Sequence, residues 1–125
     1  MNIPEGLKYT NDHEWLKVEG NIGYIGITDH AQGELGDVVF VDVEADLAEV
    51  TKDETFGTIE AVKTVADIIA PVSGKVLAVN EKLNSEPETL NNDPYGEGWI
   101  VKIELSDPSQ CDGLMDAAAY GAFLG

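Results

Sequence analysis

Apolar and polar residues alternate over most of this chain, and turn residues interrupt the pattern at short intervals. Two apolar runs flank Gly20-Asn21, which predicts a β-hairpin over residues 14–27. Further strands are predicted over residues 37–43, 55–62, 64–72, 73–80 and 99–105. On the last of these strands, alternation places four apolar residues on one face: Trp99, Val101, Ile103 and Leu105. The chain is therefore expected to be mainly β-structure.

One short internal helix is predicted directly after the hairpin. Thr28 or Asp29 can cap its first turn, because a side-chain oxygen at that position accepts a hydrogen bond from a free backbone N–H group. Gly33 and Gly36 are expected to end it.

The C-terminal segment, about residues 107–124, predicts helix as well. Asp107 can cap it, with Pro108 in the first helical position. Gly113 is expected to divide the segment, and Asp116 can cap its second part.

Two polar segments are predicted to connect these elements. Residues 44–53 indicate a surface connection, and residues 81–98, rich in Pro, Gly, Asn and acids, indicate a loop. About seven to nine short strands with a helical tail are typical of a β-sandwich or barrel. A length of 125 residues with 43% hydrophobic content predicts one folded domain spanning 1–125.

The charge of the chain excludes several partners. There are 24 acidic residues against 7 lysines, and the formal net charge is −17. A nucleic acid or an anionic membrane surface would repel such a protein, so neither is expected as a partner. The acidity suits partners with basic docking faces, and it is equally compatible with simple solubility or a salty milieu.

Candidate chemistry is sparse. The two histidines, His13 and His30, lie beside no nucleophile motif, so they are interpreted as surface or packing residues. With Cys111 as the single cysteine, neither a disulfide within the chain nor a zinc cluster is expected. Glycine-rich phosphate loops and calcium loops are absent from the sequence too. The sequence predicts no catalytic residue and no metal ligand set.

Lys63 lies between the two strands predicted over 55–62 and 64–72, which places it at or near a hairpin tip. Residue type alone favours an ordinary solvated turn lysine. Its surroundings are regular, however. Glu60 lies three residues before it, and Gly74 lies eleven residues after it in a Pro/Gly turn.

The segment T-I-E-A-V-K-T-V-A-D-I-I-A-P-V-S-G-K-V (58–76) resembles the swinging-arm segment of lipoyl and biotinyl carrier domains. In those domains a lysine at a hairpin tip carries the cofactor in amide linkage. Biotin carriers usually have Met on both sides of the lysine, and lipoyl domains of 2-oxoacid dehydrogenases usually have Asp before it and Ala after it. Here the neighbours are Val62 and Thr64. E-A-V-K instead resembles E-S-V-K of the H-protein family of the glycine cleavage system.

The resemblance to the H-protein family runs from about Gly6 to Leu124. Matching stretches are H-E-W (13–15), G-I-T-D-H-A-Q-G-E-L-G-D-V-V-F-V (26–41), N-D-P-Y-G-E-G-W-I-V-K-I (92–103) and S-D-P-S-Q-C-D-G-L-M-D-A-A-A-Y (106–120). Two departures are small. Ala61 replaces the more usual Ser, and the segment after Val43 lacks the usual Pro-Gly.

The resemblance implies a fold and a function. The fold would be a barrel-sandwich hybrid of two antiparallel sheets. Lys63 would carry lipoate in amide linkage. The lipoyl arm would take an aminomethyl group from the pyridoxal-phosphate-dependent glycine decarboxylase (P protein) to the tetrahydrofolate-dependent aminomethyltransferase (T protein). Dihydrolipoyl dehydrogenase (L protein) would reoxidise it. The chain itself would be a non-catalytic carrier, because the cofactors and partner enzymes supply the chemistry.

The resemblance also implies roles for individual residues. Glu60 and Gly74 would help the lipoyl-attaching enzymes to recognise the domain. Glu14, Asp67 and His30 would contact the arm in a cleft on the protein's own surface. The expected state is a monomer, in a bacterial cytoplasm, or in the mitochondrial matrix if the chain is a mature eukaryotic form.

Three alternatives remain open at this point. The chain could be an H-like relay protein that donates lipoate to other carriers. It could be a biotinyl domain or a dehydrogenase lipoyl domain, although the residues beside Lys63 argue against both. It could also be an acidic structural or interaction module with an ordinary turn lysine.

Overall fold

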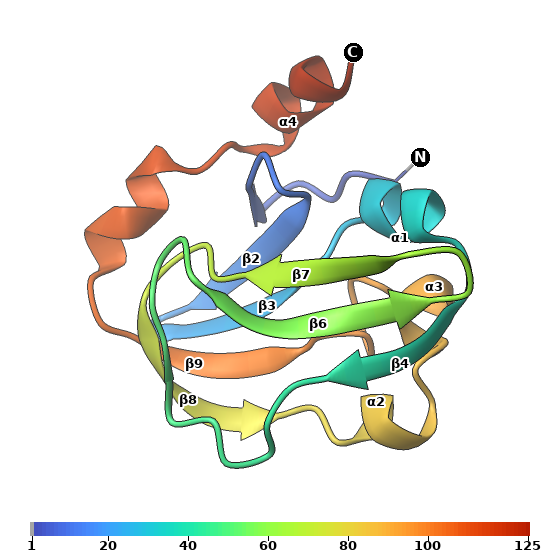
Figure 1. The fold of residues 1–125 in the computed structure, drawn as a ribbon. Helices are drawn as coiled ribbons and strands as arrows, with labels where there is room; N and C mark the ends of the chain where they lie inside the picture. Colours follow the sequence, from blue (N-terminus) through green and yellow to red (C-terminus); the bar gives the residue numbers. More distant parts are fainter. Residues whose placement is uncertain (1) are drawn as a thin grey trace.

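Two antiparallel β-sheets form the body of the protein in a computed structural model that describes residues 2–125. Six strands make the larger sheet, in the order β1-β2-β3-β9-β8-β5, and three make the smaller sheet, in the order β4-β6-β7. Figure 1 shows the smaller sheet in front of the larger one, with the C-terminal helix at one end. The prediction of a mainly β fold with two antiparallel sheets is confirmed.

The larger sheet contains β1 (Lys8–Tyr9), β2 (Glu14–Glu19), β3 (Ile22–Ile27), β5 (Glu49–Val50), β8 (Gly74–Val79) and β9 (Val101–Leu105). The smaller sheet contains β4 (Val38–Asp42), β6 (Thr55–Ala61) and β7 (Val65–Ile69). The helical segments are α1 (Asp29–Leu35), α2 (Lys82–Ser85), α3 (Thr89–Asn92), the 3₁₀ segment η1 (Pro108–Gly113) and α4 (Ala117–Leu124).

The main core lies between the inner faces of the two sheets. Leu16, Ile25 and Ile103 from the larger sheet belong to the same buried cluster as Ile59 and Ile68 from the smaller one. β2, β6, β7 and β9 also carry exposed residues, whereas all residues of β3 are buried or half-buried. The smaller sheet is therefore attached to the larger one by the packing of apolar side chains on its inner face.

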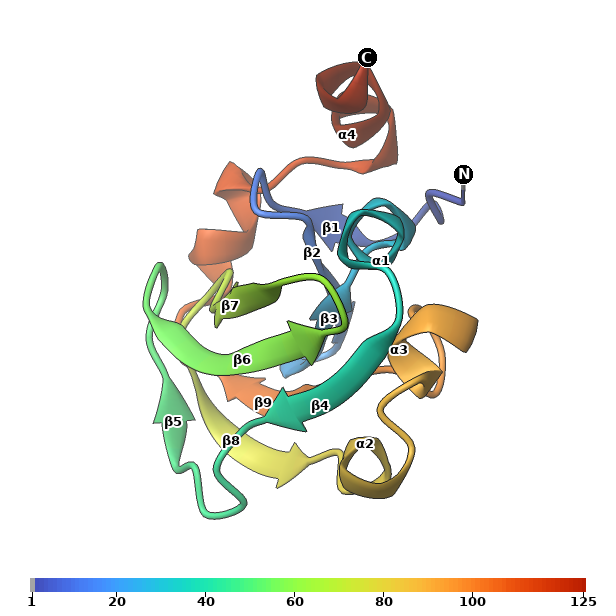
Figure 2. The same cartoon turned by 45° about the vertical axis from the view of Figure 1, so that its right-hand side comes forward.

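A second, aromatic cluster fixes the C-terminal helix. Tyr9, Trp15 and Tyr120 are fully or almost fully buried, and the rings of Tyr9 and Tyr120 stack with centroids 4.7 Å apart. The backbones of Tyr9 and Met115 exchange two hydrogen bonds, of 2.8 and 2.9 Å. Figure 2 shows α4 above β1 and α1, on the side of the molecule where this cluster lies.

The predicted hairpin and caps are found where the sequence indicated them. Gly20 turns the chain between β2 and β3 with φ +63°. Thr28 is the residue that caps α1, and Asp107 and Asp116 cap η1 and α4. These signals are local, so they do not depend on the rest of the fold.

The prediction that Gly33 ends the internal helix is wrong. Helix α1 continues through Gly33 and ends at Gly36, which has φ +75°. Glycine inside a helix costs only about 1 kcal/mol relative to alanine, so it does not stop a helix by itself. Gly36 does end the helix, because its φ of +75° and ψ of −154° lie in a region that essentially only glycine adopts.

Other predictions need correction in detail. The connection 44–53 includes the short strand β5, and the predicted loop 81–98 includes α2 and α3. The first part of the tail is a 3₁₀ helix. Trp99 precedes β9 and packs edge-on against Tyr24 in the aromatic cluster, so it does not share the main core with the buried residues of β9. Each of these details depends on tertiary contacts.

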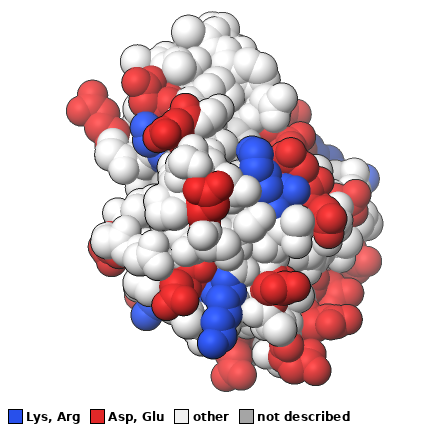
Figure 3. All heavy atoms as spheres, turned by 90° about the vertical axis from the view of Figure 1, so that its left-hand side faces the viewer, with Lys and Arg blue, Asp and Glu red and all other residues white. Residues whose placement is uncertain are grey.

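Charged side chains are dispersed over the surface. Figure 3 shows acidic side chains over most of one face, with a few lysines between them. Ion pairs within residues 2–125 involve Lys17, Lys52 and Lys82, and all of them are partly or well exposed. The imidazole of His30 lies 3.7 Å from the carboxyl of Glu34. Exposed pairs of this kind contribute little to stability.

Candidate functional site

Lys63 lies at the tip of the β6–β7 hairpin, as the sequence predicted. The backbone N–H of Ala61 donates to the carbonyl of Thr64 over 2.8 Å and closes the turn. The N–H of Val62 donates to the carbonyl of Asp37 over 3.0 Å and ties the turn to the segment before β4. Lys63 is exposed, and the turn projects at one end of the smaller sheet (Figure 1). The fold therefore presents this lysine on a fixed backbone.

The stem of the Lys63 side chain lies against the end of α1. A Cβ atom placed on Gly36 would be 3.3 Å from Cε of Lys63 and 3.7 Å from its Nζ. A side chain at position 36 would need the lysine stem to shift by a few tenths of an ångström, and glycine is the residue that readily adopts the φ of +75° found there. Within residues 2–125, Lys63 forms no ion pair. Its amine is available for attachment of another group.

Glu60 and Asp67 lie on the outer face of the smaller sheet. Glu60 is the residue before the last of β6, and Asp67 is in the middle of β7. Both are exposed. Glu60 is opposite Val65, and Asp67 is opposite Thr58, two residues further from the turn. The structure thus places the predicted recognition residue Glu60 beside the lysine tip.

Glu14, by contrast, is buried at the start of β2, where only 2% of its surface is exposed. Its Oε2 accepts a 3.0 Å hydrogen bond from the backbone N–H of Ile69, and its Oε1 accepts one of 3.1 Å from the hydroxyl of Thr10. Burial raises the pKa of Glu14 to about 8, although both hydrogen bonds act in the opposite direction. No cationic side chain within residues 2–125 forms an ion pair with this carboxyl.

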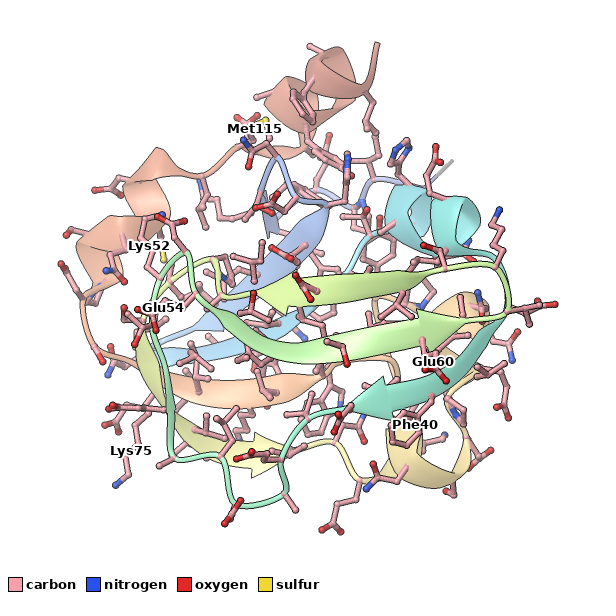
Figure 4. All side chains as sticks on the ribbon, in the orientation of Figure 1. Phe40, Lys52, Glu54, Glu60, Lys75 and Met115 are labelled. Atoms are coloured by element: carbon pink, nitrogen blue, oxygen red, sulfur yellow. The ribbon has the colours of Figure 1, made fainter. Side chains whose placement is uncertain are left out.

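Glu14 lines a cavity of about 400 Å³. The walls come from four segments: residues 9–12, Lys52 and Asp53, the end of β7 with Ala70 and Pro71, and the tail with residues 113–115 and Phe123. Figure 4 labels two of the lining residues, Lys52 and Met115. The amine of Lys52 is directed to the carbonyl of Pro71, over 3.4 Å. The carboxyl groups of Asp12 and Asp53 line the same cavity, so a cationic group entering it would meet acidic side chains.

Asp67 and His30 do not line the cavity of Glu14. His30, on α1, packs against His13 with ring centroids 4.4 Å apart and the ring planes tilted by 41°. Nδ1 of His13 lies 2.8 Å from the hydroxyl of Tyr120, which lies 2.9 Å from Oγ1 of Thr28. Burial, and next the neighbouring His30, lower the pKa of His13. Contacts of Asp67 and His30 with an arm stay predictions.

Close packing between strands explains why residue 74 is a glycine. It is buried between β5 and β9, opposite Val50 and Leu105. A Cβ atom there would be 2.6 Å from the carbonyl oxygen of Glu104, which is too close for any side chain. Its role in recognition stays a prediction, and its position shows no surface through which an enzyme would touch it.

Several residues around these sites could not be found from the sequence. The sequence indicated Gly36 only as a helix stop, yet its missing side chain also makes room for Lys63. The hydroxyl of Tyr120 contacts His13, which lies 107 residues earlier in the chain. Met115 forms an antiparallel β-bridge with Tyr9, which is also distant in the sequence. The pattern of apolar and polar residues does not predict such contacts, because they depend on how the C-terminal segment packs against the sheets.

The chain is similar to known proteins over nearly its whole length. The model of the family described as "Glycine cleavage H-protein" matches residues 7–125. The chain belongs to the glycine cleavage H-protein family. A glycine cleavage system H protein of Symbiobacterium thermophilum is 58% identical over 122 residues, which cover 98% of this chain and 95% of that protein. One of Bacteroides thetaiotaomicron is 53% identical over 124 residues, covering 99% and 98%.

A solved structure supports the same assignment. The crystal structure of a glycine cleavage system H protein from Mycobacterium marinum superposes with a TM-score of 0.89 and has 36% sequence identity, covering 98% of this chain and 99% of that one. H proteins are lipoyl carriers and components of the glycine cleavage system. No helix within residues 2–125 is both long and apolar enough to cross a membrane.

The residues at the hairpin tip fit a lipoyl group. Attachment needs an accessible lysine amine with room along its stem, and the turn and Gly36 provide both. A neutral amide at Nζ would leave no charge unpaired, because Lys63 forms no ion pair within the described residues.

Proposed function

We propose that this H protein carries lipoate in amide linkage to Lys63 and transfers the aminomethyl group between the enzymes of glycine cleavage. The observation that carries this is the position of Lys63: exposed, without an ion pair in residues 2–125, and at the tip of a hairpin whose backbone is tied to β4. A protruding tip can enter the clefts of several enzymes in turn. A lysine in the middle of a strand could not do so.

The bound lipoyl group would supply a dithiolane that takes up the aminomethyl unit on reduction and is later reoxidised. The chain's own contribution is positional. Lys63 and Gly36 set where the arm leaves the surface. Tethering keeps the carried group near each active site, and short flexible tethers give effective concentrations on the order of mM. Under this proposal residues 1–125 act as one carrier domain without a catalytic residue.

Glu14 would hold the amine of the carried group in the cavity beside the end of β7. A protonated amine next to the buried carboxyl favours its charged form, so the entering cation and the loss of the Glu14 proton are coupled. The cavity walls around the carboxyl would limit the access of water to the labile carbon–nitrogen bond.

The proposed partners are the P, T and L proteins and the lipoyl-attaching enzymes. Each must approach an acidic surface, because the formal net charge is −17 and the amide removes the charge of Lys63 as well. Enzymes with basic docking faces suit this surface. Because both relatives are bacterial proteins, we place the function in a bacterial cytoplasm. The proposed carrier is a monomer.

Intact-mass analysis of protein from its native host tests the proposal. We expect one lipoyl adduct, located on Lys63 by peptide mapping. Lys63→Arg should abolish the adduct, and Lys75→Arg, a matched change at another exposed lysine, should leave it in place. An unmodified Lys63, or biotin on it, would overturn the proposal.

A reconstitution separates a carrier from a lipoate relay. Lipoylated protein is mixed with the P, T and L proteins, glycine and tetrahydrofolate, and glycine consumption is followed. Turnover supports the carrier. Absence of turnover, with transfer of lipoate to other carrier domains, would favour the relay.

A further inference from the structure

The only two histidines of the chain lie against each other where α4 meets the rest of the protein. His13 directly precedes β2, and His30 is on α1, with the two ring centroids 4.4 Å apart. Tyr120 and Phe123 of α4 pack on the ring of His13, each with a centroid distance of 5.9 Å. Figure 2 shows α4 above α1 and β1. The histidine pair is therefore part of the surface on which α4 is docked.

A chain of hydrogen bonds connects α1 to His13 through the hydroxyl of Tyr120. Oγ1 of Thr28 accepts a hydrogen bond from the backbone N–H of Ala31 over 3.1 Å. The Thr28 hydroxyl can then donate to Tyr120 over 2.9 Å, and the Tyr120 hydroxyl to Nδ1 of His13 over 2.8 Å. In this direction every hydrogen of the chain has an acceptor, and Nδ1 carries no proton. The fully bonded arrangement therefore requires a neutral His13.

A proton on Nδ1 of His13 reverses the direction of this chain. Nδ1 must then donate to Tyr120, and Tyr120 must donate to Thr28. The hydrogen of the Thr28 hydroxyl is left without an acceptor, because no other acceptor bonds to it within residues 2–125. Thr28 and Tyr120 are both fully buried, where an unsatisfied donor is costly. A proton at this position thus weakens the docking of α4.

The charged groups around His13 act in both directions. A positive charge on His13 would face the ring of His30, and two positive rings repel each other. The acids Asp12, directly before His13, and Glu34, on α1, favour the charged form. Helix α4 contributes only uncharged side chains, over Ala117–Leu124. Burial and the neighbouring His30 outweigh the two acids, so the pKa of His13 is lowered.

Helix α4 is also part of the wall of the Glu14 cavity. Phe123 both lines this cavity and packs on the ring of His13. The carboxyl of Glu14 stays in place without α4, because it belongs to β2 and accepts its hydrogen bonds from Ile69 and Thr10. Release of α4 would therefore remove one wall and leave the buried carboxyl in an open cleft.

We propose that His13 and His30 form a pH-dependent latch for α4. While both rings are neutral, α4 stays docked and closes the cavity over Glu14. Protons on the pair release α4 and open the cavity to water. The latch itself does not depend on lipoylation of Lys63, whereas its effect on a carried aminomethyl group rests on the proposed function.

Hydrogen exchange of unlipoylated full-length protein tests the latch between about pH 7.5 and about pH 5.5, the range in which histidines titrate. The amides of α4 are compared with those of β3 in the same sample, which removes the intrinsic dependence of exchange on pH. An exposed histidine has a pKa of about 6.5, and the docked form binds fewer protons, so docking weakens as the pH falls. Protection of α4 relative to β3 should fall about tenfold in the wild type, the factor that one such group gives one unit below its pKa.

His13→Asn removes the titrating ring and keeps the local structure. Asparagine tolerates the φ of +65° found at this position, and its side-chain oxygen can accept the hydrogen bond from Tyr120. Relative protection of α4 in this variant should change by less than about twofold over the same range. His30→Gln should reduce the fall, because the second positive ring is absent. Glu14→Gln is the control: Glu14 has a pKa of about 8 and titrates nearby, and its replacement should leave the fall in place.

An equal fall in wild type and His13→Asn would overturn the latch, and so would an equal loss of protection in α4 and β3, which indicates acid unfolding of the whole protein. The NMR signal of the His13 ring in the wild type gives a second measurement that needs no variant. Protonation of His13 and exchange in α4 must change over the same pH range. Protonation without faster exchange in α4 contradicts the latch, even if His13→Asn docks α4 poorly at neutral pH.

A separate measurement on lipoylated, aminomethyl-loaded protein tests the effect on the carried group. Loss of the aminomethyl group should increase more steeply with acid in the wild type than in His13→Asn. If the two proteins lose it equally while α4 exchange follows the latch, the latch stands and its connection to the carried group is wrong. If Lys63 accepts no lipoate, the proposed function fails, and the exchange result on unlipoylated protein still decides the latch.

Discussion

The side chain of Glu14 in β2 and the backbone of Ile69 in β7 join the two sheets through a hydrogen bond of 3.0 Å. Strands at the edge of a sheet leave N–H groups unpaired, and this bond satisfies one of them with a buried carboxyl. The same contact forms part of the cavity wall. One residue thus contributes to sheet packing and to the proposed binding of a cation.

Glu14→Gln should change how stability depends on pH. Burial raises the pKa of Glu14 from 4.5 to about 8, so the folded protein keeps a proton that the unfolded chain releases in this range. The free energy of unfolding of the wild type should therefore fall as the pH rises from 4.5 to about 8, by on the order of 2–4 kcal/mol. Glutamine cannot ionise, so the variant should lack this loss. Urea denaturation at several pH values measures it.

The exposed Glu104→Gln is the matched control for that series, because its carboxyl lies at the surface of β9. Its stability difference from wild type should not grow with pH. A constant difference between Glu14→Gln and wild type over the same range would contradict the raised pKa.

Gly36→Ala and Gly33→Ala should have opposite effects on stability. Gly36 has φ +75°, so alanine there should lower the free energy of unfolding by about 1 kcal/mol. Gly33 lies inside α1, and an added Cβ would meet no atom within 4 Å, so alanine should raise stability by about 0.5–1 kcal/mol. Urea denaturation distinguishes the two. Equal effects would show that the positive φ is not what matters at Gly36.

Gly74→Ala should destabilise the sheet by about 2 kcal/mol, because the new Cβ overlaps the carbonyl of Glu104 in the neighbouring strand. Gly113→Ala, where an added Cβ meets nothing within 4 Å, is the control and should have little effect. The lipoylation rate of the folded fraction should match wild type if Gly74 acts only through packing. A slower rate at equal folded fraction would support the predicted recognition role.

Tyr120→Phe should loosen the C-terminal helix. The hydroxyl joins His13 and Thr28 in a buried site, and its removal leaves their polar atoms without this partner, at a cost of about 1–3 kcal/mol. Hydrogen exchange should increase in α4 more than in the sheets. Tyr24→Phe keeps the ring that packs edge-on against Trp99 and should change stability by less than about 0.5 kcal/mol. Unchanged exchange in α4 would contradict the role of this hydroxyl.

Local signals predicted many elements well. The apolar runs around Gly20 predicted the β2–β3 hairpin, and Thr28, Asp107 and Asp116 predicted the helix caps. Each of these features depends on a few neighbouring residues. The strands around Lys63 placed it at a tip for the same reason. Sequence signals predicted the structure less well where tertiary packing overrides the local preference. Gly33 is tolerated inside a helix, and the polar stretch 81–98 forms two short helices when Leu83 and Leu90 pack into the core.

Periodicity, composition and turn residues are properties of neighbours along the chain, so they were enough to predict the strand pattern, the acidic charge and one lysine at a hairpin tip. The surroundings of that lysine depend on tertiary packing. Gly36 comes beside its stem, Phe40 and Val65 come into one row with Glu60, and the tail closes a cavity over Glu14. These contacts join residues from separate elements, and they exist only once the two sheets and the tail have packed together.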